Sequence, residues 1–219
     1  MIAKNLHQIK DKLPEHVTLV AVSKTKPNAA ILEAYQAGQR IFGENKIQEM
    51  AAKYDELPKD IQWHMIGHLQ SNKVKYMAHF VDLIHGVDSF KTLKEINKQA
   101  KKHERVIKCL LQARIAVEET KFGLSFKDIN EIITSKDFLE LQHIEIVGLM
   151  GMATFTDDQE QLSEEFSSLK QFFDKLKTQN SKLKNLSMGM SGDYQLAIEN
   201  GSTMVRVGSA IFGARNYIV

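Results

Sequence analysis

The chain lacks the residues that would stabilise a fold by cross-links. It has one cysteine, Cys109, and three prolines among 219 residues. A single cysteine cannot form an internal disulfide, which favours a reducing compartment such as the cytoplasm. Cys109 stands in the apolar run VIKCLLQA with no catalytic motif around it, so we expect it to be a small core residue.

The chain also lacks a block of charge of one sign and a long apolar run. Its 29 basic and 27 acidic side chains are interleaved and give a formal net charge of +2. This pattern argues against a nucleic-acid-binding arm. No apolar stretch is long enough to span a bilayer, and the charged N-terminal segment does not resemble a signal peptide. We therefore expect neither nucleic acid nor a membrane as a partner, and a cytoplasmic location.

What the chain does have is a repeated alternation of short apolar runs and charged segments. The charged segments, such as NKIQEMAAKYDEL, carry apolar residues at three- and four-residue intervals, as amphipathic helices do. Strands that alternate with helices in this way are parallel and are joined by crossovers. The apolar runs lie near residues 17–23, 40–43, 61–66, 81–86, 105–113, 143–150, 185–189 and 203–207.

Eight such units predict an α/β fold, a single (β/α)8 TIM-type barrel, with an extra N-terminal helix over residues 1–13. An open doubly wound sheet is the alternative. It usually has fewer strands, and no GxGxxG motif follows the first strand here. Because no linker rich in glycine, serine or proline interrupts the chain, residues 1–219 are expected to form one domain.

The first apolar run ends unusually, in the stretch VAVSKTKPNAA. Lys24 is expected to be the last residue of this strand, at the barrel mouth where functional groups gather. Its ammonium can pair with a phosphate, or its amine can lose a proton and attack an aldehyde to form an imine. Pro27 pushes Lys26 towards an extended conformation, so Lys24 and not Lys26 is expected to face the mouth.

The last two strands end in glycine and small hydroxyl residues, in LSMGMSGD and VRVGSAIFGAR. Glycine lets the backbone approach an anion, while N–H groups and serine hydroxyls donate to it. Phosphate sites in barrels often form from the loops after strands seven and eight. Pyridoxal 5'-phosphate (PLP) carries an aldehyde and a phosphate, and it fits an amine that faces an anion cradle.

Arg206 lies inside the eighth strand, where its charge needs a partner. It can pair with a core carboxylate. If the ligand is PLP, it can instead hydrogen-bond the ring nitrogen and keep that nitrogen unprotonated, because adjacent positive charges repel. An unprotonated ring is a poorer electron sink, which favours holding the cofactor over broad carbanion chemistry.

The third strand and the residues after it carry several polar side chains. His64 is expected to be a hydrogen-bonded core residue rather than an acid or base, and His68 to begin the next helix and make a local contact. Periodicity does not fix the direction of the polar run Gln70, Asn72 and Lys73.

Several motifs occur in a fixed order over nearly the whole chain: AVSKTKP, FGEN…QE, WHMIGHLQSNK, KFG, GLM and LSMGMSGDYQLAIENGSTMVRVGSAIFG. Together they resemble the pyridoxal phosphate homeostasis protein family. The resemblance implies a barrel like the N-terminal domain of alanine racemases, with PLP held as an imine on Lys24. It also implies that Asn45 lies near the cofactor, that Arg206 faces the ring nitrogen, and that the phosphate is held by Ser191, Gly208 and Ser209.

Two functions of different classes follow. The first is a protein that holds PLP for intracellular homeostasis, expected to be a monomer without robust catalysis, with apo PLP enzymes as recipients. The second is an amino-acid racemase with slow one-base chemistry. The alanine racemases that share this barrel carry a second domain, and their two-base chemistry uses a tyrosine contributed by the dimer partner. The residues after the eighth strand are too few for a domain, and nothing places Tyr217 opposite Lys24. A Schiff-base aldolase also fits the barrel, but the whole-chain resemblance argues against it.

Overall fold

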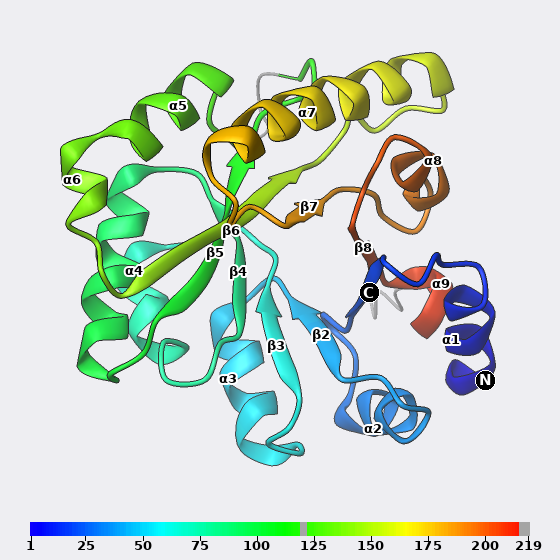
Figure 1. Cartoon of the computed structure of the whole chain (residues 1–219). Helices are drawn as coiled ribbons and strands as arrows, with labels where there is room; N and C mark the ends of the chain where they lie inside the picture. The colour runs from blue at the N-terminus through cyan, green and yellow to red at the C-terminus, as the bar shows by residue number, and fades with distance from the viewer. Residues whose placement is uncertain (119–121, 215–219) are drawn as a thin grey trace.

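The computed structural model describes residues 1–118 and 122–214. In these residues eight parallel strands pair in chain order and close into a barrel, with the helices around the outside (Figure 1). β1 and β8 complete the ring, with Val20 opposite Arg206. The barrel prediction is confirmed. The strands are β1 (Thr18–Val22), β2 (Ile41–Glu44), β3 (Gln62–Met65), β4 (Leu83–Val87), β5 (Ile107–Ala113), β6 (Ile144–Gly151), β7 (Asn185–Ser187) and β8 (Met204–Val207).

The connections are short, which explains how a full barrel fits in 219 residues. The crossover from β3 to β4 uses only a 3-10 helix, η1 (Ser71–Tyr76). The predicted N-terminal helix is present as α1 (Ile2–Lys10) and packs beside α9 (Figure 1). The other helices are α2 (Asn28–Gln36), α3 (Ile47–Glu56), α4 (Phe90–Lys102), α5 (Phe126–Thr134), α6 (Lys136–Leu139), α7 (Gln159–Gln179), α8 (Tyr194–Glu199) and α9 (Ser209–Phe212).

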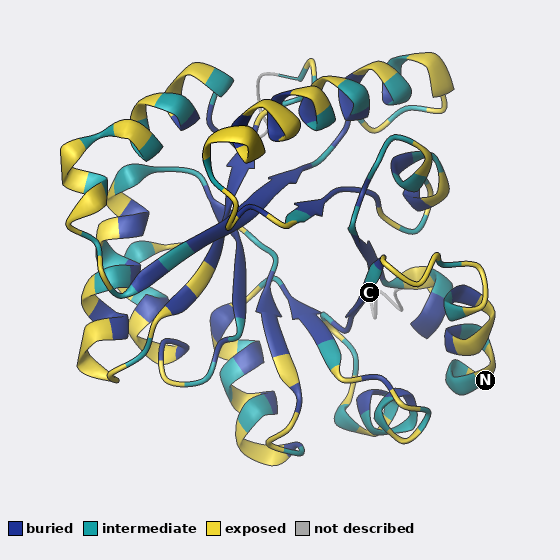
Figure 2. Ribbon diagram, viewed as in Figure 1, coloured by how far each residue is buried: buried dark blue, intermediate teal, exposed yellow. Residues whose placement is uncertain are grey.

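Hydrophobic side chains pack in two layers because successive strand residues point to opposite faces. In β1, Leu19 and Ala21 pack in the layer between strands and helices, while Val20 packs inside the barrel. Figure 2 shows the strands almost wholly buried and the outer helix faces exposed. Cys109 is fully buried in the outer layer, and burial raises the pKa of its thiol. It is a core residue, as expected.

Two local predictions are wrong. β1 ends at Val22, so Lys24 lies in a turn beyond the strand. The chain bends there because Thr25 adopts φ +64°, a left-handed conformation that is unusual for a β-branched residue. His68 does not begin a helix, since η1 starts at Ser71. The chain before η1 crosses the end of β2 so closely that a Cβ on Gly67 would lie 2.5 Å from a backbone oxygen.

A helix that spans a bilayer needs about 20 predominantly apolar residues. In the two described ranges, no helix combines enough length with enough apolar character to cross a membrane.

Candidate functional site

A cavity of about 740 Å³ opens at the C-terminal end of the barrel. That volume lies in the range of small-molecule and cofactor sites. Its walls come from the C-terminal ends of β1, β2, β3, β5, β6, β7 and β8 and the loops after them. The structure brings all six of the predicted site residues to this one cavity: Lys24, Asn45, Ser191, Arg206, Gly208 and Ser209.

Four residues next to Lys24 contact one another and the backbone of the turn that carries Lys24. We call them the Lys53 cluster (Ser23, Glu44, Glu49 and Lys53). Nζ of Lys53 donates to the Ser23 carbonyl at 2.9 Å and to carboxylates of Glu44 and Glu49 at 2.8 and 2.7 Å. The Ser23 hydroxyl donates to Glu44 at 2.6 Å. The Thr25 N–H donates to Glu49 at 2.6 Å. The backbone is therefore fixed on both sides of Lys24.

The Lys53 cluster places two carboxylates on one ammonium, that of Glu44 fully buried and that of Glu49 partly exposed. Burial raises the pKa of Glu44, although Lys53 opposes the shift. Burial acts in the same direction on Glu49, but hydrogen bonds from Lys53 and from the Thr25 N–H outweigh it and lower its pKa. Oε2 of Glu44 is buried with no hydrogen-bond partner among the described residues. Lys53 is thus the cation that contacts both carboxylates of the cluster.

Lys26 also lines the cavity, contrary to the expectation that only Lys24 faces it, but the amine of Lys26 is engaged by backbone carbonyls. Its Nζ donates to the carbonyl oxygens of Phe212, Gly213 and Ala214, each at 3.1 Å. These carbonyls lie at the end of α9, where a cation interacts favourably with the helix dipole. Lys26 therefore ties the turn after β1 to the C-terminal helix. The sequence carried no signal for this contact, because the acceptors lie more than 180 residues away.

Arg206 is almost fully buried, with 4% of its surface exposed. Its Nη1 donates to the Ser187 hydroxyl at 2.6 Å and its Nη2 to the Gly151 carbonyl at 3.0 Å. Both acceptors are uncharged, so these contacts are not the carboxylate pairing that the sequence left open. Burial lowers the pKa of Arg206 to about 10, against the field of Asp193. The guanidinium is therefore a cation at neutral pH.

The loops after β7 and β8 form the wall beside the Lys24 turn, since β8 pairs with β1. They are joined by a hydrogen bond in which the Gly208 N–H donates to the Ser191 hydroxyl at 3.1 Å. That bond uses an acceptor position of Ser191 and leaves its O–H to donate. A Cβ on Gly208 would lie 3.2 Å from the Val22 carbonyl oxygen, so glycine permits the close approach of β8 to β1. Ser209 lies exposed at the start of α9.

Two more groups complete the cavity wall. The side-chain oxygen of Asn45 is buried and has no hydrogen-bond partner among the described residues, so it is an acceptor that lacks a donor. His68 lies at the rim, where its Nδ1 is 2.8 Å from Asp88 and its ring stacks on Phe122. Asp88 and Phe122 lie far along the chain from His68, which also lines the cavity, so the expectation of a merely local contact is wrong. The polar run Gln70, Asn72 and Lys73 does not line the cavity.

His64 lies in the barrel interior and is 2% exposed. Its Nδ1 is 3.0 Å from Nε2 of His85, and Nδ1 of His85 is 3.1 Å from the Ser187 hydroxyl. Burial lowers the pKa of both histidines, and that of His85 falls furthest. His64 is thus a hydrogen-bonded core residue, as expected. The parts played by His85 and Ser187 were not predicted, since their contact spans 102 residues.

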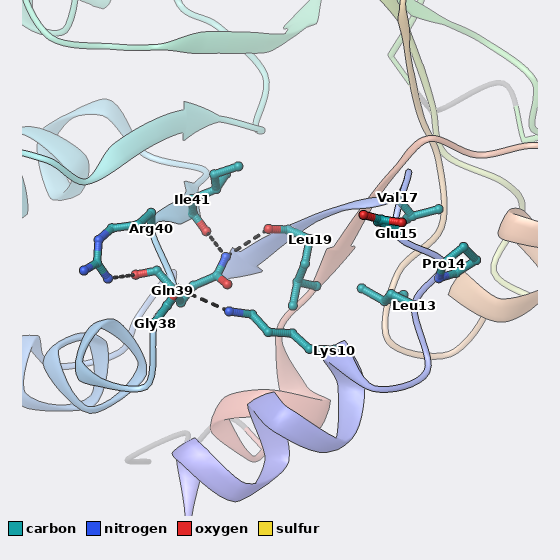
Figure 3. A pocket seen from close by; sticks show the side chains of 10 residues that line it. All are labelled: Lys10, Leu13, Pro14, Glu15, Val17, Leu19, Gly38, Gln39, Arg40 and Ile41. Carbon is teal, nitrogen blue, oxygen red and sulfur yellow. Dashed lines mark hydrogen bonds between the residues drawn. The ribbon is translucent and has the colours of Figure 1, made fainter.

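A second cavity, of about 360 Å³, lies at the opposite end of the barrel, beside the end of α1 (Figure 3). Its polar side chains bond to nearby backbone. Lys10 donates to the Gly38 carbonyl, and the Gln39 amide donates to the carbonyls of Leu19 and Ile41. None of the predicted site residues lines it. The larger cavity is therefore the candidate site.

Comparisons with known proteins agree with this fold. The family model described as alanine racemase, N-terminal domain, matches residues 1–216. A pyridoxal phosphate homeostasis protein of Vibrio alginolyticus is 41% identical over 94% of this chain and 90% of its own length. One of Escherichia coli (strain K12) is 39% identical over 99% of this chain and 97% of its own length.

The solved structures give the same relationship. PipY of Synechococcus elongatus, solved with PLP bound, superposes with a TM-score of 0.87 at 39% identity, over 97% of this chain and all of its own. An alanine racemase of Clostridium difficile shares only the fold, with a TM-score of 0.79 at 17% identity, and this chain covers 56% of it. The chain therefore belongs to the alanine racemase N-terminal domain family and, within it, to the pyridoxal phosphate homeostasis proteins.

Proposed function

We propose that this protein binds PLP in the cavity at the C-terminal end of the barrel and serves PLP homeostasis. The observation that carries the proposal is that an amine, an anion cradle and a buried cation, from Lys24, the Ser191–Gly208 wall and Arg206, line one cavity. The curated relatives are named for this function, and a related structure was solved with PLP bound.

The residues present fit PLP in size and in chemistry. The cavity volume of about 740 Å³ accommodates a ring with a phosphate ester. The Ser191 O–H and backbone N–H groups after β8 supply donors for the phosphate. The buried oxygen of Asn45, which has no described partner, is ready to accept a hydrogen bond from a bound group. An unpartnered buried acceptor costs free energy unless a ligand or water satisfies it.

When bound, PLP supplies an aldehyde that condenses with primary amines and a ring that withdraws electrons. The side chain of Lys24 provides the amine that bonds the aldehyde carbon. The Lys53 cluster holds the turn so that this amine enters the cavity. Arg206 presents its charge to the ring nitrogen and disfavours a proton there, because two adjacent positive charges repel. Lys24 is also the group that releases the cofactor, when another amine takes its place.

A holding role fits these residues better than racemase chemistry. A cation beside the ring nitrogen weakens the ring as an electron sink, and racemisation depends on that sink. The alanine racemases among the solved structures share only the fold with this chain. Slow proton transfer by Lys24 after its release from the cofactor is the alternative, and a racemase assay distinguishes the two.

We further propose that residues 1–219 form a single domain that acts as a monomer in the cytoplasm. Apo PLP enzymes are the recipients that we propose for the cofactor. The lone buried cysteine and the absence of a linker rich in glycine, serine or proline support this view.

The test is to load the purified protein with PLP, reduce it with borohydride and map the modified peptide. The pyridoxyl mass is expected on Lys24, and Lys24→Ala should abolish the tag. Lys73→Ala is the matched control, since Lys73 lies outside the cavity. A tag on Lys26 with Lys24 unmodified would contradict the assignment. A racemase assay on the same sample should give little activity, and turnover on the scale of a working racemase would favour the enzyme.

A further inference from the structure

A line of polar side chains runs through the hydrophobic interior of the barrel behind the cavity. It starts at Arg206 on β8 and passes to Ser187 on β7, then crosses to His85 on β4 and His64 on β3, and ends at Asp82 before β4. The successive contacts are 2.6 Å, 3.1 Å, 3.0 Å and 3.6 Å. We call these five residues the barrel relay.

The two ends of the barrel relay lie at opposite ends of the barrel. Arg206 lines the cavity at the C-terminal end. Asp82 precedes the first residue of β4, at the N-terminal end, and its side chain is 38% exposed. The three residues between them are buried, with exposed fractions of 0 to 2%. The relay therefore connects the candidate site with solvent on the far side of the barrel.

The chemistry of its ends fixes the direction of the three hydrogen bonds and of the longer contact between His64 and Asp82. A guanidinium has only donors and a carboxylate only acceptors. Ser187 accepts from Arg206, and its own proton then faces Nδ1 of His85. A His85 that accepts at Nδ1 carries its proton on Nε2, which faces Nδ1 of His64. His64 in turn carries its proton on Nε2, which faces Asp82.

The opposite direction leaves mismatched groups at the Asp82 end. If His85 carried its proton on Nδ1, its Nε2 would have to accept from Nδ1 of His64. The bare Nε2 of His64 would then face the Asp82 carboxylate at 3.6 Å, acceptor against acceptor. Such a pair is repulsive in a low-dielectric interior. The ordered direction puts a donor opposite an acceptor at each contact.

The barrel relay is also built to stay uncharged between its ends. Burial disfavours an imidazolium at both histidines, and at His85 the neighbouring His64 and Arg206 disfavour it further. Asp82 favours a proton on His64, while Lys108 opposes it. Within the relay, Arg206 thus contacts only neutral dipoles, and Asp82 stands at the far end; the carboxylate whose charge acts on Arg206 is that of Asp193, at the cavity.

We propose that Ser187, His85, His64 and Asp82 are positioning residues for Arg206, and that they form an ordered hydrogen-bond relay which holds its guanidinium as a full cation towards the cavity. A carboxylate in direct contact would cancel much of that charge, whereas a line of aligned neutral dipoles satisfies the donors without cancelling it. The relay itself is independent of any cofactor. Its effect on bound PLP rests on the proposed function.

The first test uses the unmutated protein without cofactor. Nitrogen-15 NMR of the histidine side chains distinguishes a protonated Nδ1 from a protonated Nε2. Signals that disappear in His64→Gln and His85→Asn assign the two rings among the eight histidines. Both rings are expected to be neutral and protonated on Nε2 at pH 7. A proton on Nδ1 of His85, or an imidazolium at either ring, would overturn the ordered relay.

The second test compares two buried serines in the barrel. Ser187→Ala removes the relay contact to Arg206, whereas Ser202→Ala removes a hydroxyl that contacts only backbone carbonyls; both serines are 0% exposed. A contact to a charged group is lost only in the first, so PLP binding should weaken about tenfold or more. Without this contact Arg206 is no longer held beside the ring nitrogen, so that nitrogen should take up a proton at a higher pH. The midpoint of the absorption change in a pH titration of bound PLP should therefore rise. Ser202→Ala should leave this midpoint unchanged.

Equal midpoints in the two variants would overturn the positioning role. If the unmutated protein fails to bind PLP, the proposed function is wrong, while the histidine tautomers still decide whether the relay exists. If Ser187→Ala does not fold, those tautomers remain the deciding measurement.

Discussion

The two ends of the cavity rest on buried polar groups of opposite design. Beneath Lys24 lies the Lys53 cluster, in which an ammonium and two carboxylates are in direct contact. Behind Arg206 lies the barrel relay, whose inner members are a serine and two histidines. In the Lys53 cluster, side chains of opposite charge pair directly. In the barrel relay, neutral side chains hydrogen-bond to one another and to a single cation, Arg206.

The difference matches what the proposed function requires of Lys24 and of Arg206. The contacts of the Lys53 cluster fix the backbone on either side of Lys24, at the Ser23 carbonyl and the Thr25 N–H. A side chain that makes and breaks a covalent bond needs a fixed base and a movable end. The barrel relay instead contacts the guanidinium itself. A group that sets the electrostatics of a ring acts best when it does not move.

The largest expected effect comes from removing the only cation of the Lys53 cluster. Lys53→Met leaves the carboxylates of Glu44 and Glu49 without their shared ammonium. Breaking a buried pair in this way costs about 3–5 kcal/mol. Urea unfolding at pH 7 measures the loss. The control is Lys94→Met, because the pair between Lys94 and Asp137 is exposed and such pairs contribute about 0–1 kcal/mol. Equal losses in the two variants would show that the cluster is not a stabilising element.

The next effect separates binding from stability. Ser191 belongs to neither buried group, and its hydroxyl lines the cavity. Ser191→Ala should weaken PLP binding by roughly 1.5–3 kcal/mol, the value of a hydrogen bond to a charged group, and leave capture of unphosphorylated pyridoxal nearly unchanged. Titrations with both ligands measure the difference. Ser181→Ala, an exposed serine before β7, is the control. The same loss for both ligands would place Ser191 away from the phosphate.

The sequence predicted the barrel and the cavity residues better than it predicted either buried group. Eight apolar runs alternating with helical segments leave few folds, and strand ends of a barrel converge on one face. Lys53, by contrast, follows Glu49 by four residues in an amphipathic helix, which is typical of an exposed ion pair. It is buried because β2 places Glu44 beside it. That contact forms only when α3 packs against β2, and no local sequence pattern predicts it.

The same reason explains the missed relay. His85 and Ser187 each lie in an apolar run, where one polar residue is unremarkable. Their contact forms only because the closed barrel brings β4 and β7 to face each other across its interior. The end of β1 was misplaced for a local reason. Nothing in the residue type of Thr25 indicates a left-handed backbone, since glycine or asparagine usually occupies that conformation.

The smallest expected effect is a pH dependence that belongs to the barrel relay. Burial lowers the folded-state pKa of His64 and His85 below 6.5, so below that pH the unfolded chain binds more protons than the folded one. Stability from these rings is complete above about pH 6.5 and is lost as the pH falls. Each ring contributes a slope of up to about 1.4 kcal/mol per pH unit.

Urea unfolding at pH 7.5, 6.5 and 5.5 measures this slope in the unmutated protein and in two variants. His85→Asn removes a buried ring and should flatten the slope, while His16→Asn removes an exposed ring and should not. Titrating groups outside the relay, including Glu44 with its raised pKa, contribute equally to all three proteins and cancel in the comparison, so a flatter slope in His85→Asn reports on His85 together with its neighbour His64. An unchanged slope in His85→Asn would mean that this ring takes up a proton inside the folded barrel. The relay would then hold charge as the Lys53 cluster does, and the contrast between the two ends of the cavity would disappear.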